Sequence, residues 1–283
     1  MMQERIRSEI DALAAEFNGR FGLAATNLQT NETFAYHAAD IFPTASTIKL
    51  PVLATLMAQV HNGDYSLDDP LMLRRADMIG GSGLLQKMTP GLVMPIRDWA
   101  FLMMNISDNT ATNVLIDHVG KAAVQTWLTE NGYADVQLHN KIDFPALGHD
   151  LYHFGSATPA GLNRLITAVF HHDIISPSAC DEMLRMMDKV GSDRVGRFLP
   201  FEPFDATVDD SERLRLAGKT GSFKGCRAQT AVVWRGTREQ QCGYTITVMT
   251  EGDPAPETWS IDAAGTLLIG RLARLFYDVV LGE

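Results

Sequence analysis

The chain has 283 residues, of which 46% are hydrophobic and 20% charged, and its formal net charge is −10. This length suffices for one large domain or two medium ones, and the composition is that of a soluble globular protein. The negative charge disfavours a nucleic-acid partner, because phosphate backbones are negative as well. The sequence contains no run of 18 or more apolar residues, so it predicts no membrane span.

The N-terminal segment, MMQERIRSEIDALAAEF, lacks the apolar stretch and cleavage site of a signal peptide. A cytoplasmic location is therefore the expectation, and the earlier removal of an export signal stays open as the alternative. Apolar residues in this segment recur at the spacing of one helical face, which predicts an amphipathic helix over residues 4–17. Two apolar runs on either side of the polar turn at residues 30–32 then predict a β-hairpin.

Helical periodicity dominates the middle of the chain, from Ser46 to about Leu199. Within it, three methionines at helical spacing are expected to fill core: Met183, Met186 and Met187. After a loop at residues 200–211, strand patterns return in three runs: LRLAGKT, QTAVVWR and GYTITVMT. The chain closes with a predicted helix from roughly Ser260 to Leu281.

These elements predict an α/β fold of the α+β kind. An antiparallel sheet of about five strands would be built from both chain ends, with the terminal helices on its outer face. The expected units are a discontinuous sheet domain of residues 1–45 and 205–283 and an inserted all-helical domain of residues 46–204. A cleft between two such units is a usual place for a small-molecule site.

Three short motifs carry side chains suited to acyl transfer. Ser46 and Lys49 are three residues apart, so a helix that begins near Ser46 brings the amine toward the hydroxyl. A serine needs such a base, and a lysine acts as one when burial or a neighbouring positive charge lowers its pKa. In the second motif, Ser107 and Asn109 alternate around Asp108 in a turn between two helical stretches, so both side chains can point to one side.

The third motif, Lys219-Thr220-Gly221 followed by Ser222, ends a predicted strand. A cation and a hydroxyl on an edge strand can bind a carboxylate, and a glycine lets a substrate backbone approach closely. Taken singly, the motifs also fit a helix start, a capping turn and a strand end. Their order along one chain, with a helical block between the first and the third, favours a shared active site.

Together the three motifs resemble those of class A β-lactamases and penicillin-binding proteins. The resemblance runs from the first hairpin to the last helix, and it is densest in FPTASTIKLPVLATL, GGSGLLQKMTPGLVMPIRDWAFLMMNISDNTATNVLIDHVG and AGKTGSFKG. It implies a β-lactamase-like fold with no cofactor or metal and a small-molecule substrate. It does not indicate an oligomeric state.

The resemblance also implies roles for the motif residues. Ser46 would attack the carbonyl carbon and form an acyl-enzyme, and Lys49 would take its proton directly or through water. Ser107 would pass a proton to the departing nitrogen, and Asn109 would contact Lys49 and the acyl side chain.

The remaining implied roles concern substrate binding. Lys219 and Thr220, with help from Ser222, would anchor a carboxylate. The backbone N–H groups of Ser46 and Ser222 would form an oxyanion hole, which typically contributes about 10²–10³-fold in rate.

One stretch departs from the class A pattern. Class A enzymes carry a glutamate there that activates the water releasing the acyl-enzyme, but residues 138–162, LHNKIDFPALGHDLYHFGSATPAGL, contain no glutamate. Asp143 lies roughly where that glutamate would be and is the candidate base for deacylation. His149 and His153 near Asp150 resemble a metal pair, but no third strong ligand accompanies them, so we expect no metal.

Three functions follow as hypotheses. The first is a β-lactamase-like hydrolase that opens cyclic amides. The second is an esterase or a D-amino-acid amidase or peptidase that uses the same Ser46 and Lys49. The third is a penicillin-binding protein that is acylated at Ser46 and turns over slowly.

Overall fold

The computed structural model describes residues 2–148, 150–202 and 207–282 of the chain. Its main feature is an antiparallel sheet of five strands in the order β2-β1-β10-β9-β8. The strands are β1 (Arg20–Asn27), β2 (Thr33–Tyr36), β8 (Leu214–Phe223), β9 (Cys226–Arg235) and β10 (Gly243–Glu251). Two of them come from the N-terminal hairpin and three from the last third of the chain, as the sequence predicts.

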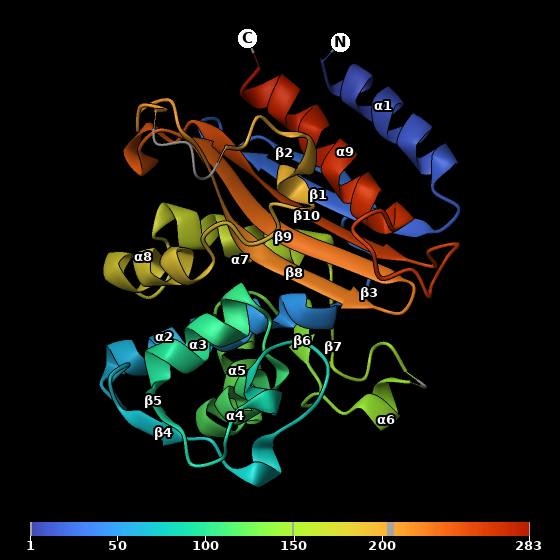
Figure 1. Cartoon of the computed structure of the whole chain (residues 1–283). Helices are drawn as coiled ribbons and strands as arrows, with labels where there is room; N and C mark the ends of the chain where they lie inside the picture. Colours follow the sequence, from blue (N-terminus) through green and yellow to red (C-terminus); the bar gives the residue numbers. More distant parts are fainter. Residues whose placement is uncertain (1, 149, 203–206, 283) are drawn as a thin grey trace.

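Two terminal helices cover one face of this sheet, α1 (Met2–Glu16) and α9 (Ala264–Val280) (Figure 1). A hydrophobic cluster fills the space between, in which Ile10 and Leu272 have no exposed surface. The Tyr244 hydroxyl on β10 donates a hydrogen bond to the Ala273 carbonyl at 2.7 Å, which ties the last helix to the sheet. The prediction of terminal helices on the outer face is therefore confirmed.

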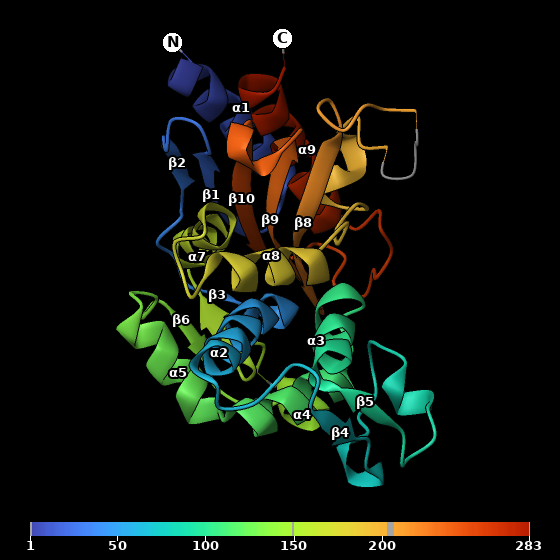
Figure 2. The same cartoon turned by 90° about the vertical axis from the view of Figure 1, so that its left-hand side faces the viewer.

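The opposite face of the sheet packs against α7 (Pro159–His171), which contacts β1, β9 and β10. Two polar contacts reinforce this packing. The Asn163 amide donates to the Thr26 hydroxyl at 2.8 Å, and the hydroxyls of Thr167 and Thr245 lie 2.7 Å apart. In Figure 2, α7 lies beside α8 (Pro177–Met186), between the sheet and the remaining labelled helices of the middle block.

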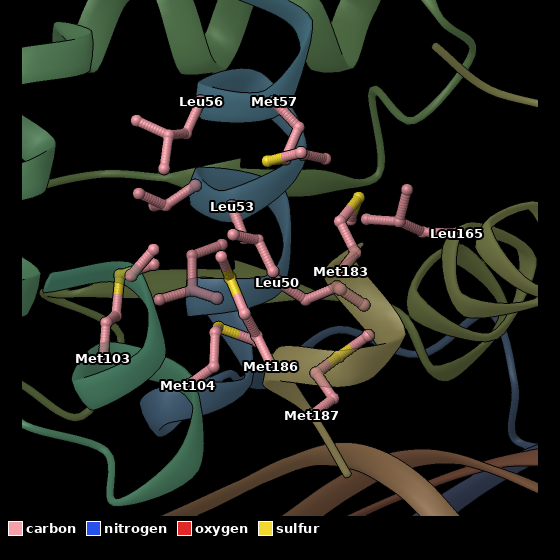
Figure 3. Packing of buried hydrophobic residues seen from close by; sticks show 14 of the residues in the cluster. Leu50, Leu53, Leu56, Met57, Met103, Met104, Leu165, Met183, Met186 and Met187 are labelled. Carbon is pink, nitrogen blue, oxygen red and sulfur yellow. The ribbon is translucent and has the colours of Figure 1, made fainter. Parts of the chain in front are cut away.

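The middle block is arranged around α2 (Lys49–Asn62), in which every residue from Lys49 to Met57 is buried. Figure 3 shows methionines of two neighbouring helices packed against its leucines, including Met183, Met186 and Met187, all of which are buried. The other helices of the block are α3 (Ile96–Asn105), α4 (Asn109–Val119), α5 (Lys121–Glu130), α6 (Phe144–Leu147) and α8 (Pro177–Met186).

The middle block also contains short strands that the sequence does not predict, and one of them pairs with β3 (Phe42–Pro43), which lies just before the block. A three-stranded sheet in the order β3-β7-β6 and a β4-β5 pair are formed by β3 (Phe42–Pro43), β4 (Pro70–Met72), β5 (Val93–Pro95), β6 (Val136–Leu138) and β7 (Gly155–Ala157). Strands of two or three residues are too short to show an alternating pattern, so periodicity cannot reveal them. The inserted block is therefore mainly, but not purely, helical.

The division into units of residues 1–45 with 205–283 and residues 46–204 stays a proposal, and its second boundary lies outside the described residues. All three cysteines are free: Cys180 and Cys226 are buried and Cys242 is half-buried. In the described part of the chain, no helix is long and apolar enough to cross a membrane.

Candidate active site

Ser46 lies in a 3₁₀ turn, η1 (Ala45–Ile48), directly before α2. The preceding residue, Ala45, has a φ of 44°. This left-handed conformation costs a non-glycine residue on the order of 1–2 kcal/mol, so the surrounding structure must hold it in place. Within the described ranges, the Ser46 hydroxyl makes no hydrogen bond, which leaves its oxygen available for attack.

Lys49 is fully buried one turn after Ser46. Its Nζ donates to the Ser107 carbonyl oxygen and hydroxyl, both at 2.9 Å, and to Asn109 Oδ1 at 3.2 Å. Burial, together with the positive charge of Lys219, holds the pKa of Lys49 well below its usual range, although Asp108 acts in the opposite direction. A lowered pKa makes the neutral amine, the form that can accept a proton, accessible at a lower pH than for an exposed lysine.

The turn between α3 and α4 presents Ser107 and Asn109 to Lys49, as their alternation predicts. The intervening residue, Asp108, is fully buried and has a structural role. Its Oδ1 accepts the Ala111 N–H at 2.9 Å and caps α4, while its Oδ2 accepts the N–H groups of Leu84 and Leu85 at 2.6 and 2.9 Å. The capping interpretation of this motif is confirmed for Asp108. The contacts of Ser107 and Asn109 with Lys49 fit the active-site interpretation, which stays a prediction.

The third motif lies on β8, the edge strand next to η1. A Cβ atom at Gly221 would lie 2.8 Å from the Thr44 carbonyl oxygen and 2.9 Å from the Ser46 nitrogen, so only glycine permits this approach. The Gly218 N–H donates to the Met187 carbonyl, away from β9. Because strand groups alternate, the Ser222 N–H points to the same open edge.

Lys219 is fully buried on β8, and its Nζ donates to the Thr220 carbonyl at 2.9 Å. Burial and the nearby Arg194 guanidinium lower the pKa of Lys219 to about 7. An arriving carboxylate would favour the charged form of this amine. Thr220 is half-buried and lines a cleft together with Asn105 and Gly191, so it is accessible to a ligand.

Arg194, which no motif in the sequence indicates, lies close to this strand. Its guanidinium donates to the Ser222 hydroxyl at 2.7 Å and to the carbonyls of Gly221 and Ala228 at 2.9 and 3.2 Å. Burial lowers the pKa of Arg194 to about 10, so it stays charged at neutral pH. Lys219, Arg194 and Ser222 therefore form a cationic patch at the β8 side of Ser46.

Comparison with known proteins agrees with this geometry. The sequence profile described as "Beta-lactamase enzyme family" matches residues 5–280. The chain belongs to the β-lactamase enzyme family. It is accordingly a serine β-lactamase-type hydrolase, as the motif trio predicts.

Individual relatives of this β-lactamase-family enzyme are distant. A β-lactamase of Rhodobacter capsulatus is 25% identical over 81% of this chain and 75% of its own length. The crystal structure of a β-lactamase from Sphaerobacter thermophilus covers 97% of this chain and 96% of its own, with 29% identity and a TM-score of 0.83. The structure of PBP-A covers 100% of this chain and 96% of its own at 24% identity, with a TM-score of 0.80, and it shares the fold.

In this family member, Asp143 is exposed and caps the short helix α6. Its Oδ1 accepts the Ala146 N–H at 3.3 Å. No hydrogen bond or ion pair between Asp143 and Ser46, Lys49 or Ser107 occurs in the described residues. Its role as the base for deacylation stays a prediction, and the capping contact is a competing reason for an aspartate at this position.

No metal site that includes His153 occurs among the described residues. His149 lies outside the described residues, and His153 contacts Asn140, whose amide donates to the His153 carbonyl at 2.9 Å. Among the described residues, no group of three or more His, Cys, Asp or Glu side chains is arranged to hold a metal ion.

Proposed function

We propose that this enzyme opens the amide bond of β-lactams through a covalent acyl-enzyme on Ser46. The observation that carries the proposal is the buried contact of Lys49 with Ser107 and Asn109, one turn from Ser46. In this arrangement Lys49 can serve as the base for Ser46, and the Ser107 hydroxyl can relay the proton. The direct test is hydrolysis of a chromogenic cephalosporin, which should be measurable for the wild-type enzyme and absent without Ser46.

Acylation then proceeds in two stages, attack on the carbonyl carbon and cleavage of the carbon–nitrogen bond. The Ser46 oxygen bonds to the carbonyl carbon while Lys49 accepts its proton. The negative charge that develops on the carbonyl oxygen is met by the backbone N–H groups of Ser46 and Ser222. As the carbon–nitrogen bond breaks, Ser107 gives a proton to the nitrogen and regains one from Lys49. The product is an ester on Ser46, with the amine base restored.

The cationic patch on the β8 side supports substrates that carry a carboxylate. Arg194 supplies one positive charge there, and Lys219 supplies a second when an arriving carboxylate favours its charged form; the hydroxyls of Thr220 and Ser222 supply further donors. Charge-assisted hydrogen bonds of this kind are stronger than neutral ones, and a guanidinium offers several donors in a fixed plane.

Arg194→Ala should raise the KM of a carboxylate-bearing β-lactam by about tenfold, because one charge-assisted contact is lost. An activated ester without a carboxylate should be affected much less. Steady-state kinetics on both substrates measure the difference, and Arg197→Ala, which removes a guanidinium paired with Asp262, is the matched control. Equal losses on both substrates would assign Arg194 to the support of β8 alone.

Asp143→Asn should lengthen the acyl-enzyme lifetime by about 10²-fold if the Asp143 carboxylate activates the deacylating water. Asparagine caps a helix about as well as aspartate, so this substitution removes the charge and keeps the α6 cap. The lifetime is measured by time-resolved intact mass, with the acylation rate as internal control. A lifetime equal to that of the wild type would remove Asp143 from the mechanism.

A second candidate function is that of a penicillin-binding protein with slow turnover. The specific observation in its favour is the absence of a glutamate from residues 138–162, together with the exposed, capping position of Asp143. A persistent mass adduct with benzylpenicillin would support this function, and a transient one would support the hydrolase. No adduct would favour the esterase or D-amino-acid amidase alternative at the same site.

A further inference from the structure

Arg194 belongs to a turn, residues 190–195, that lies between α8 and the 3₁₀ turn η4 (Val195–Phe198) along the chain. The chain enters this turn from the edge of β8, where the Lys189 N–H donates to the Leu216 carbonyl at 2.8 Å. Because Arg194 is carried by the turn and not by β8 itself, the position of its guanidinium depends on what holds the turn.

One buried side chain holds both ends of the turn. Gln229 lies on β9 and has no exposed surface. Its amide nitrogen donates to the Val190 carbonyl at 3.4 Å, and its amide oxygen accepts the Val195 N–H at 3.1 Å. These bonds are shielded from water, and a buried polar group that loses its partner is costly, so the amide fixes the first and last residues of the turn relative to β9.

The backbone of the turn is shaped to fit this amide. A Cβ atom added to Gly191 would lie 2.5 Å from Gln229 Cδ, so the amide occupies the space that a side chain at this position would need. Gly191 also has a φ of 85°, a conformation that favours glycine. The contact is thus built from both sides, by a buried amide on β9 and by a glycine in the turn.

The guanidinium of Arg194 leaves the turn directly before Val195, the residue whose N–H Gln229 binds. It donates to the Ser222 hydroxyl and to the carbonyls of Gly221 and Ala228, which are all uncharged acceptors. An arginine side chain has many rotamers, so a displaced backbone at Arg194 would change where its charge lies.

We propose that Gln229 is a positioning residue for Arg194, which holds the turn of residues 190–195 so that the guanidinium meets the carboxylate of the substrate. The inference rests on the proposed function, which assigns carboxylate binding to the cationic patch that includes Arg194. Gln229 is buried and acts through the turn, so its effect on binding should disappear when Arg194 is absent.

The test is a double-mutant cycle on the noncovalent binding of benzylpenicillin to the Ser46→Ala protein, measured by calorimetry. Arg194→Ala and Gln229→Met should each weaken binding by about tenfold, the effect of one charge-assisted contact. Methionine fills a similar volume without the amide. The two substitutions together should also weaken binding by about tenfold, because residues that act through one contact are not additive.

Gly191→Ala disturbs the same contact from the turn, because the new methyl group displaces the Gln229 amide. It should give the same loss and the same lack of additivity with Arg194→Ala, and it keeps the test decisive if Gln229→Met does not fold. Thr245→Val is the matched control, since it removes a buried hydroxyl from the sheet at its contact with α7 and should leave binding unchanged.

Losses that multiply to about a hundredfold in the double variant would overturn the inference. Unchanged binding in Arg194→Ala, or in both Gln229→Met and Gly191→Ala, would overturn it as well, and so would an absence of binding to the Ser46→Ala protein itself. Acylation of the wild-type enzyme is measured separately by intact mass. The predicted cycle without any acylation would contradict the proposed function and keep the inference, whereas acylation with independent losses would do the reverse.

Discussion

Replacing Ser46 by alanine is expected to lower β-lactam hydrolysis by at least about three orders of magnitude, because no other group can form the acyl-enzyme. The loss should appear in kcat, and the covalent adduct should vanish. Folding should be unaffected, since the Ser46 hydroxyl makes no hydrogen bond in the described residues and sits in a turn held by Thr47, whose hydroxyl donates to the Thr44 carbonyl at 2.7 Å.

The control for this variant is Ser178→Ala, which removes an exposed serine hydroxyl on α8 far along the chain. Both variants should give the thermal midpoint of the wild type within a degree or so, because neither removes a buried contact. Substantial hydrolysis by Ser46→Ala would mean that another residue is the nucleophile.

Replacing Lys49 by methionine should slow acylation by about 10²–10⁴-fold, the range that a positioned general base contributes. Methionine nearly preserves the volume of the buried side chain, so the substitution removes the amine without a large cavity. Lys87→Met, at an exposed lysine in the 3₁₀ turn η3 (Leu85–Lys87), is the matched control. The second-order rate of adduct formation at Ser46 is the measured quantity.

The pH dependence of acylation gives a further signature of Lys49. Its pKa lies well below the usual value, so the neutral amine should persist at a pH where an exposed lysine is charged. As pH falls through this lowered pKa, the amine gains a proton and the acylation rate should drop. Lys49→Met should lose this decrease of the acylation rate at low pH. A decrease of the same shape in Lys49→Met would mean that another group titrates.

Much of the fold can be predicted from local sequence patterns. The long strands β8, β9 and β10 carry enough alternating and β-branched residues to stand out, and α1 and α9 show clear helical faces. The short strands in and next to the middle block depend on tertiary pairing, as between Phe42 and Ala157, and leave no period in the sequence. The helix α6 also leaves no period in the sequence, because it is a single turn that begins after the Asp143 cap.

The residues of the candidate site also fall into two groups: those that short sequence motifs indicate and those that only the fold brings together. Ser46, Lys49, Ser107 and Asn109 lie in short motifs whose spacing indicates their neighbours, and the structure brings the last three into contact. Arg194 has no such signal, because it approaches β8 only through the fold. The approach of the Phe144 ring to Gly81 joins residues 63 positions apart and is likewise visible only in three dimensions.

The central claim is that Ser46 becomes acylated, and one measurement tests it most directly. The wild-type enzyme is mixed with benzylpenicillin, quenched at successive times, and analysed by intact mass and by peptide mapping. We predict a mass increase of one intact penicillin, located on the peptide that contains Ser46, with no such increase in Ser46→Ala. An adduct on another residue, or hydrolysis that continues unchanged in Ser46→Ala, would contradict the account.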